Sequence, residues 1–338
     1  MTQGVVKEFT RNDLIHVSLE NDKIRVVFLP EIGGKMIELT LKETGRQYLL
    51  EPQNPEQFYK RAYYGANFEE YDTSGFDECF PTIEPSEHPQ LAELRGGDNI
   101  IFPDHGELWA LSWHHHIDGE QLILTANGIK FQYRFIKHIK LFDNHVLIDY
   151  HLKNYSDHPF KYIWSAHPLL KVEAGARLVL DKEIEKVFLN WASDAELGGF
   201  GDELSWPVIG SGNTMVDYSK VQSKEFGKAL KCFTGSLNKG VAGIYHPDTD
   251  EHLLFHFDPA ENPYLGIWLC YGGWPVNNEE KHLTVGLEPA SGRPDSLKEA
   301  INRNEYAEIL AGEGKKWSIK MTLMKGRPQF WSNVDIKE

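Results

Sequence analysis

The chain has 338 residues and a formal net charge of −15 at pH 7, with 50 acidic residues against 35 basic ones. Nucleic acids and anionic membranes are bound by clustered Lys and Arg, so this charge balance argues against both as partners. No apolar run reaches the length that crosses a membrane, and residues 1–11 lack the pattern of a secretory signal.

The first fifty residues predict strands. Apolar and polar side chains alternate over residues 14–19, 23–29 and 35–41, which is the period of a half-buried strand. Residues 20–22 separate the first two strands by a length that suits a hairpin loop. The chain is therefore expected to begin with antiparallel strands that are neighbours in the sequence.

Residues 51–104 lose this periodicity and contain six prolines, which argues against long helices or strands there. Eight acidic residues but no Lys or Arg occur between Arg61 and Arg95. Disordered segments are poor in aromatic residues, so we predict an ordered, acidic and aromatic surface. Rings cover apolar C–H faces and carboxylates accept hydroxyl hydrogen bonds, so this surface suits a neutral, polyhydroxylated ligand and disfavours a phosphorylated one. The aromatic residues are Tyr63, Tyr64, Phe68, Tyr71, Phe76 and Phe80.

From residue 108 onward, strand patterns follow one another, and Asp118-Gly119 and Asn127-Gly128 are strong hairpin signals. The glycine-rich residues 190–219 lose the pattern and predict a long surface excursion. Strands are predicted over residues 108–116, 121–126, 129–141, 145–154, 160–172, 177–187, 231–233, 241–245, 253–257, 264–269, 282–287 and 317–323.

Successive strands without intervening helices are typical of antiparallel sheets packed as a sandwich. The sequence has no internal repeat and no low-complexity segment. We therefore predict an all-β fold, in which residues 1–338 form one large antiparallel β-sandwich domain with a few short helices. The chief helix is expected over residues 295–304, where Ser296 and Glu299 have the spacing of a capping box.

The cysteines bear on the compartment. Cys79, Cys232 and Cys270 are widely spaced and form no C-x-x-C pair. Such cysteines fit free thiols in a reducing compartment better than a disulfide framework. We therefore expect a cytoplasmic protein.

Glu288 follows the strand pattern of residues 282–287 and precedes Pro289, which is not expected inside a central strand. Period two places Glu288 on the same face as Gly286 and Thr284. A carboxylate beside a glycine at the end of a strand can project into a concavity. Most strand-end glutamates are solvated, but these neighbours favour a functional role for Glu288.

Two histidines stand at positions that suggest function. His167 lies in an apolar strand pattern directly before Pro168, which removes a ladder donor and predicts a break or bulge beside the imidazole. His105 precedes Gly106 where the acidic aromatic segment meets the next strand. A histidine within a strand is more often a core residue whose ring nitrogens are hydrogen-bonded than a functional one.

A metal site is a further use of histidine that the sequence raises. His114, His116 and Glu120 form an H-x-H-x3-E pattern close to the metal motif of cupins, but the flanking glycines do not have the cupin spacing. Ligands confined to one hairpin also need a further inward-facing donor. We therefore predict no metal and no other cofactor.

Taken together, the motifs resemble the aldose 1-epimerases, that is, the galactose mutarotase-like superfamily, over residues 14–323. The resemblance implies a large β-sandwich with the sugar in a cleft across one sheet. Typical members carry an Asn-Arg-Ile segment before the His-Gly pair, whereas residues 75–83 contain no arginine, so we expect a divergent member. The motifs that carry the resemblance are, in order, His105-Gly106, His167-Pro168 and Glu288 followed by Pro294-Asp295.

Carried over by position, the resemblance implies that Glu288 is the catalytic base, His167 the acid and His105 a second donor near the ring oxygen. The implied activity is that of an isomerase, which interconverts the α and β anomers of a free monosaccharide by acid/base ring opening and closure. Asp77, Trp268 and Arg293 are the further residues expected to contact the sugar.

Two alternatives stay open. In a glycoside hydrolase or lyase, Asp77 and Glu288 would form a carboxylate pair roughly 5–10 Å apart. A carbohydrate-binding protein without catalysis would keep the aromatic surface and would not need His167 near the ligand. The sequence carries no signal for the oligomeric state.

Overall fold

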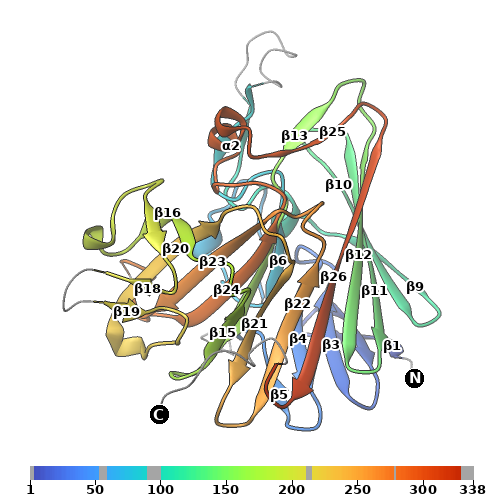
Figure 1. Cartoon of the computed structure of the whole chain (residues 1–338). Coiled ribbons are helices and arrows are strands. Elements are labelled where there is room, and N and C mark those ends of the chain that lie inside the picture. The colour runs from blue at the N-terminus through green and yellow to red at the C-terminus, as the bar shows by residue number, and fades with distance from the viewer. Residues whose placement is uncertain (1–3, 53–58, 90–99, 211–214, 278, 329–338) are drawn as a thin grey trace.

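The structure is a computed structural model and describes residues 4–52, 59–89, 100–210, 215–277 and 279–328. Over these ranges two large sheets of antiparallel strands form the body of the protein (Figure 1). The predicted all-β antiparallel sandwich is confirmed. No helix among the described residues is long and apolar enough to span a bilayer.

The larger sheet has 12 strands in the order β1-β2-β3-β4-β6-β14-β24-β23-β20-β16-β17, with β5 paired to β4. Its members are β1 (Val5–Arg11), β2 (Leu14–Glu20), β3 (Ile24–Leu29), β4 (Lys35–Leu41), β5 (Arg46–Gln47), β6 (Phe76–Cys79), β14 (Ser165–Lys171), β16 (Lys186–Ala192), β17 (Glu203–Ser205), β20 (Lys228–Thr234), β23 (Tyr264–Tyr271) and β24 (Leu283–Ala290).

The smaller sheet has eight strands in the order β15-β21-β22-β26-β12-β11-β10-β9. Three two-stranded sheets complete the described strands: β13 (Phe160–Tyr162) with β25 (Ala307–Ile309), β18 (Val208–Ile209) with β19 (Val216–Asp217), and β7 (Ser86–Glu87) with β8 (Ile101–Phe102). The eight strands are β9 (His114–Asp118), β10 (Gln121–Asn127), β11 (Tyr133–Phe142), β12 (His145–Asn154), β15 (Arg177–Leu180), β21 (Val241–His246), β22 (Glu251–Phe257) and β26 (Gly314–Lys325).

Helical segments among the described residues are short. The α-helix α2 (Leu297–Arg303) begins after Ser296, whose hydroxyl accepts a hydrogen bond from the backbone N–H of Glu299, as the capping-box spacing predicts. Its buried Leu297 and Ala300 pack in a small cluster with Cys79 of β6, which fixes the start of the helix over the larger sheet. The 3-10 segments are η1 (Phe68–Glu70), η2 (Leu108–Ala110), η3 (Ala195–Leu197) and η5 (Lys224–Phe226).

Several strand predictions differ in extent from the structure, and two of them show why. Residues 108–116 begin with η2, and only the part from His114 is extended, because Leu111 accepts a backbone hydrogen bond from distant Gly33 and Trp113 donates to Leu108. Residues 177–187 divide between β15 and β16, which belong to different sheets. Such contacts between distant segments leave no trace in local periodicity.

Pro289 also departs from expectation, because it lies inside β24 and pairs with Leu265 of β23. On the other side, β14 and β24 pair at Ser165–Ala290 and next at Leu169–Gly286, so the ladder is interrupted over three residues of each strand. Proline has no N–H to donate, so a central strand tolerates Pro289 where its ladder is open.

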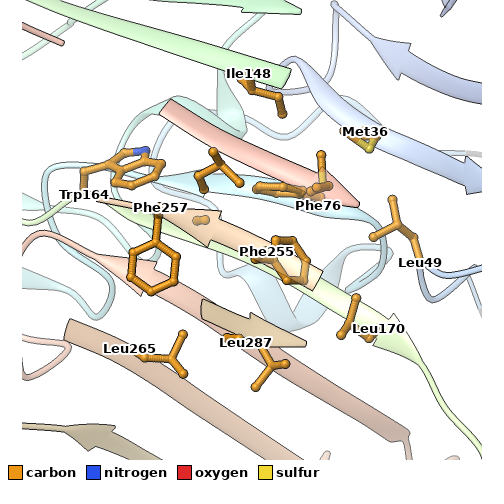
Figure 2. Packing of buried hydrophobic residues seen from close by; sticks show 14 of the residues in the cluster. Met36, Leu49, Phe76, Ile148, Trp164, Leu170, Phe255, Phe257, Leu265 and Leu287 are labelled. Atoms are coloured by element: carbon orange, nitrogen blue, oxygen red, sulfur yellow. The ribbon is translucent and has the colours of Figure 1, made fainter. Parts of the chain in front are cut away.

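Alternate residues of β24 face opposite sides of the larger sheet. Val285 and Leu287 belong to the main hydrophobic core, while Thr284 and Glu288 face away from it and line a cavity. Figure 2 shows part of this core, in which Leu287 and Phe76 of the larger sheet lie with Phe255 of the smaller one. Burying one such side chain contributes roughly 1.5–3 kcal/mol, so the core fixes which face of β24 carries Glu288.

A buried ion pair crosses this core. Glu78 of β6 accepts hydrogen bonds from Nζ of Lys137 on β11 at 3.2 Å and from the Tyr150 hydroxyl on β12 at 3.1 Å. Its second oxygen accepts from Nε1 of Trp164 at 2.9 Å, and Lys137 also donates to the carbonyl of Gly34 at 2.8 Å. Both carboxylate oxygens are therefore bonded, and the network ties the two sheets together.

Candidate active site

Four adjacent strands of the larger sheet place ionisable side chains in one row on the face away from the core. Pairing of Met36 with Phe76 sets Lys35 of β4 beside Asp77 of β6, and Asp77 pairs directly with His167 of β14. The shared register of the flanking β14–β24 pairs sets His167 opposite Glu288. Residues in register across a sheet share a face, so sequence positions 35, 77, 167 and 288 become neighbours.

The interrupted ladder lies at the centre of this row. His167 and Glu288 face each other where β14 and β24 do not pair, beside Pro168 and Pro289. The break that Pro168 predicted beside His167 is confirmed. It lets the two side chains be positioned by their surroundings rather than by ladder hydrogen bonds between their own strands.

Glu288 is fully buried, and two glycines make room for its carboxylate. A Cβ at Gly286 would lie 2.8 Å from Oε1 of Glu288, and a Cβ at Gly266 would lie 3.1 Å from Oε2. Real Cβ atoms rarely come this close to a neighbour. The carboxylate therefore occupies the space that side chains on the two paired strands would need, as the glycine beside Glu288 in the sequence suggested.

Lys231 of β20 provides the charge partner of Glu288. Its Nζ donates a hydrogen bond to Oε2 of Glu288 and lies 3.8 Å from Oδ1 of Asp295. Burial opposes the charge on Lys231, but the two carboxylates outweigh it and raise the pKa of the ammonium. The other oxygen of Asp295 accepts from Nδ2 of Asn190 at 2.9 Å.

Asp295 stands directly before the cap of α2, which turns its carboxylate toward Lys231. Burial raises the pKa of Asp295 to about 6 against the attraction of Lys231, and the charge of Glu288 adds to the rise. The cavity therefore holds two carboxyl groups that share one ammonium.

His167 is also buried, and its Nε2 lies 4.0 Å from Oε1 of Glu288. Burial lowers the pKa of His167 well below its usual value, and the nearby charges of His105, Lys231 and Lys35 act in the same direction. The imidazole is therefore neutral near pH 7.

His105 approaches His167 edge to face, with ring centroids 4.8 Å apart. Its ring is stacked on Phe68 at 4.1 Å, and its Nδ1 lies 2.9 Å from Oδ1 of Asp104. The carboxylate favours a proton on Nδ1 of His105 and leaves Nε2 available.

These side chains line one cavity of about 270 Å³. Ten buried side-chain polar atoms lack a hydrogen-bond partner in the described part of the chain, and four of them belong to cavity-lining residues: His167 Nδ1, His282 Nδ1, Glu288 Oε1 and Asp295 Oδ1. Buried polar atoms are normally bonded, so these four unpaired atoms make the cavity a candidate ligand site. The wall includes the aromatic residues Phe68, Trp191, Trp268 and Trp274, and the polar residues Thr73, Glu84, His105, Asn190, Lys231 and Thr284.

The six residues predicted from the sequence divide into two groups. His105, His167, Trp268 and Glu288 line the cavity together. Asp77 belongs to the same row but does not line it; its carboxylate is fully buried and lies 3.0 Å from Nζ of Lys35, without the angle of a hydrogen bond.

Arg293 lies outside the cavity wall. Its guanidinium donates to Oε1 of Glu305 at 2.7 and 3.0 Å and lies over the ring of Phe188, with 4.0 Å between guanidinium carbon and ring centroid. These contacts hold the turn between β24 and α2, so the nearness of Arg293 to Glu288 in the sequence does not bring it to the cavity.

Lys231, Asp295, Asn190 and two of the tryptophans are cavity residues that the sequence interpretation did not assign. Lys231 carried a usable signal, because a lysine within a short apolar strand is an unusual choice unless it has a buried partner. Asp295 entered the sequence analysis only as part of the Pro294-Asp295 motif, without a role in the site. Asn190 carried no signal, because it meets Asp295 only through a tertiary contact.

Two groups of side chains bear on metal binding. In the described residues His115 of β9 bonds to Glu8 at 2.7 Å, and the cupin-like histidines do not join a group of three ligands. Cys79, His105 and His167 do form such a group, with one ligand atom from each lying within 4.8 Å of the others.

Comparison with known proteins supports the fold. The family described as "Domain of unknown function (DUF5107)" matches residues 4–84, and no curated protein matches the chain. A galactose mutarotase-like protein from Lactobacillus casei has 14% identity and a TM-score of 0.66, with 91% of this chain and 100% of that chain covered.

Two further solved structures agree. A galactose mutarotase-like protein from Clostridium acetobutylicum has 14% identity and a TM-score of 0.66 over 96% of this chain and 99% of that chain. The Slr1438 protein from Synechocystis sp. PCC 6803 has 15% identity and a TM-score of 0.64 over 95% and 96%. The chain therefore has the galactose mutarotase-like fold, as a divergent example of it.

Proposed function

We propose that the protein interconverts the α and β anomers of a free, neutral aldose by acid/base ring opening and closure. One observation carries the proposal: the unpaired Oε1 of Glu288 and Nε2 of His167 face each other at 4.0 Å on the wall of an aromatic-lined cavity. This separation is too long for a direct hydrogen bond, so both atoms are available to a ligand.

The reaction needs one base and one acid. Glu288 takes the proton of the C1 hydroxyl through Oε1 as the acid protonates the ring oxygen, and the ring opens to the aldehyde. Rotation about C1–C2 followed by closure, with the two proton transfers reversed, gives the other anomer. Both proton carriers return to their starting state, so no net proton is consumed.

Lys231 supports the base in this scheme. A buried carboxylate is costly unless it is paired, and the hydrogen bond from Lys231 to Oε2 neutralises Glu288 while leaving Oε1 unbonded. The ammonium thereby fixes which oxygen of Glu288 faces the ligand.

His167 is the acid, with its protonated form as a minor species in the empty cavity because burial lowers its pKa. A lower pKa makes that form a stronger acid toward a weakly basic ring oxygen. In its imidazolium form His105 donates through Nδ1 to Asp104 and is placed to donate a second hydrogen bond through Nε2 near the same oxygen.

Anomer-resolved NMR with a panel of free and phosphorylated aldoses tests the proposal. Catalysed exchange between anomers is expected for at least one neutral aldose, with phosphorylated aldoses poorer because Glu288, Asp295 and Glu84 line the cavity. Saturable binding of aldoses without faster exchange would support a carbohydrate-binding protein instead.

A second candidate, glycoside cleavage, is favoured by Asp295. A carboxyl group whose pKa is raised to about 6 beside a second carboxylate is the arrangement that such cleavage uses. The pair is Glu288 and Asp295 rather than the Asp77 and Glu288 expected from the sequence, since His167 stands between the latter two. Methyl glycosides in the same NMR assay distinguish the reactions, because only a hydrolase or lyase releases a reducing sugar or an unsaturated product from them.

A further inference from the structure

Cys79 has no part in the proposed reaction, yet it lies beside both catalytic histidines. It follows Asp77 by two positions on β6 and so points to the same side of the sheet, and it pairs with Ser165 of β14, two positions before His167. One ligand atom from each of Cys79, His105 and His167 lies within 4.8 Å of the others. Three different segments thus bring a ligand atom to one place, and two of the three residues, His105 and His167, line the cavity.

The three side chains form a ligand set of defined preference. One thiolate and two imidazoles bind Zn²⁺ and its neighbours, and they discriminate against Mg²⁺ and Ca²⁺, which prefer oxygen. Three protein ligands would leave a fourth coordination position for a water or another small ligand, as in catalytic zinc sites.

The surroundings of the histidines point the same way. Nδ1 of His167 is buried without a hydrogen-bond partner. His105 is oriented by Asp104 at 2.9 Å through Nδ1, which is the carboxylate–histidine contact that orients a metal ligand and leaves Nε2 for the ion.

We propose that Cys79, His105 and His167 bind a thiolate-preferring divalent cation such as Zn²⁺, and that the bound ion switches the acid/base site off. Binding displaces the thiol proton of Cys79 and uses neutral imidazoles, so one proton is released for each ion bound. Both histidines would then be held as neutral metal ligands and could not carry the proton that the acid must deliver to the sugar. The inhibitory part rests on the proposed function, whereas the binding part does not.

Cobalt(II) alone, added to the full chain, is the probe. A thiolate ligand gives a sulfur-to-cobalt charge-transfer band in the near ultraviolet, and we expect this band in the parent protein, bleached by Zn²⁺ and unaffected by Mg²⁺. Cys79→Ser should lose the band. It should also weaken Co²⁺ binding by at least roughly 10–100-fold, because loss of a residue that only orients a ligand already costs that much.

Cys232→Ser is the matched control, because Cys232 is equally buried but lies on β20 in the main core. It should keep the band. Asp104→Asn keeps the three ligands and should weaken Co²⁺ binding about 10–100-fold, which tests the site even if Cys79→Ser does not fold. A band that survives in a folded Cys79→Ser protein, or Co²⁺ binding that Asp104→Asn leaves unchanged, would overturn the proposal.

Activity provides the second readout. Zn²⁺ should inhibit anomer exchange in the parent protein, a chelator should restore it, and raising the sugar concentration should weaken Zn²⁺ binding. Inhibition that is equal in Cys79→Ser, relative to that protein's own metal-free rate, would overturn the regulatory part. A protein that shows the thiolate band but exchanges no anomers would keep the metal site and lose the proposed function.

Discussion

Glu78 and Glu288 lie on opposite faces of the larger sheet and are equally inaccessible, with 1% and 0% of their surfaces exposed. Each has a buried lysine as its partner, Lys137 in one case and Lys231 in the other. Both oxygens of Glu78 accept hydrogen bonds from the protein, whereas Oε1 of Glu288 accepts none. Burial and ion pairing are therefore the same for the two glutamates. They differ in Oε1 of Glu288, which has no hydrogen-bond partner in the protein and can accept a hydrogen bond from a ligand.

Glu288→Gln tests the different roles of the two glutamates and should have the largest effect. Glutamine keeps the shape and a hydrogen bond to Lys231 but cannot take the C1 proton, so kcat for anomer exchange should fall by about 10²–10⁴-fold. Sugar binding, followed by titration calorimetry, should survive. A Glu288→Gln protein that exchanges anomers at the parent rate would remove Glu288 from the mechanism.

Glu78→Gln should produce the opposite pattern. Loss of the carboxylate leaves Lys137 buried without its counter-charge, and breaking a buried pair costs about 3–5 kcal/mol. Denaturant unfolding should show this loss, while kcat per folded molecule stays close to the parent value. If kcat falls and stability holds, the two glutamates do not divide the roles as described.

Gly286→Ala tests the space around the unbonded oxygen. A Cβ 2.8 Å from Oε1 must displace the Glu288 side chain, and misplacing a reacting group by about 1 Å can cost up to about 10²-fold in rate. We expect kcat to fall between about 10-fold and 100-fold. Gly235→Ala is the control, because its nearest neighbour would be Phe188 at 3.9 Å; equal losses in both proteins would argue against a steric effect on Glu288.

Asp295→Asn should give the smallest effect, visible in the pH dependence of stability. Burial raises the pKa of Asp295 to about 6, so the folded state holds this proton more tightly than the unfolded chain does. Its favourable contribution is complete below the ordinary pKa near 4 and is lost as pH rises to about 6, at roughly 1.4 kcal/mol for each unit of difference.

The measurement is the difference in unfolding free energy between Asp295→Asn and the parent protein from pH 4 to pH 7. It should move in favour of the variant as pH rises and level off above about pH 6. Asp248→Asn, at an exposed position, should show no such trend. A difference that does not vary with pH would contradict the burial-driven shift.

Local sequence patterns were enough for the fold and for part of the candidate site. Alternation and turn signals predicted the sandwich, and the contexts of His105, His167 and Glu288 led to residues that line one cavity. Period two tells which face of its own strand a residue occupies. It carries no information on which distant strand becomes the neighbour or in what register.

This missing information explains why the sequence did not predict the other cavity residues. Lys231 reaches Glu288 only because β20, β23 and β24 are adjacent, although β20 and β24 are some fifty residues apart in the chain. Arg293 is close to Glu288 in the sequence but forms its ion pair with Glu305 instead. Contacts of this kind follow from the assembled sheet and not from the strands that compose it.

Strand β6 has a further consequence for how reliably the sheet assembles. It is four residues long, and its adjacent acids Asp77 and Glu78 serve opposite faces, one beside Lys35 and the other beside Lys137. A slip of one residue would move one acid into the place of the other and turn the second acid away from its lysine, so Lys35 or Lys137 would lose its partner on β6. The two adjacent acids thus disfavour misaligned pairing of β6. A change at either one should reduce the yield of correctly folded chains as well as the stability of those that fold.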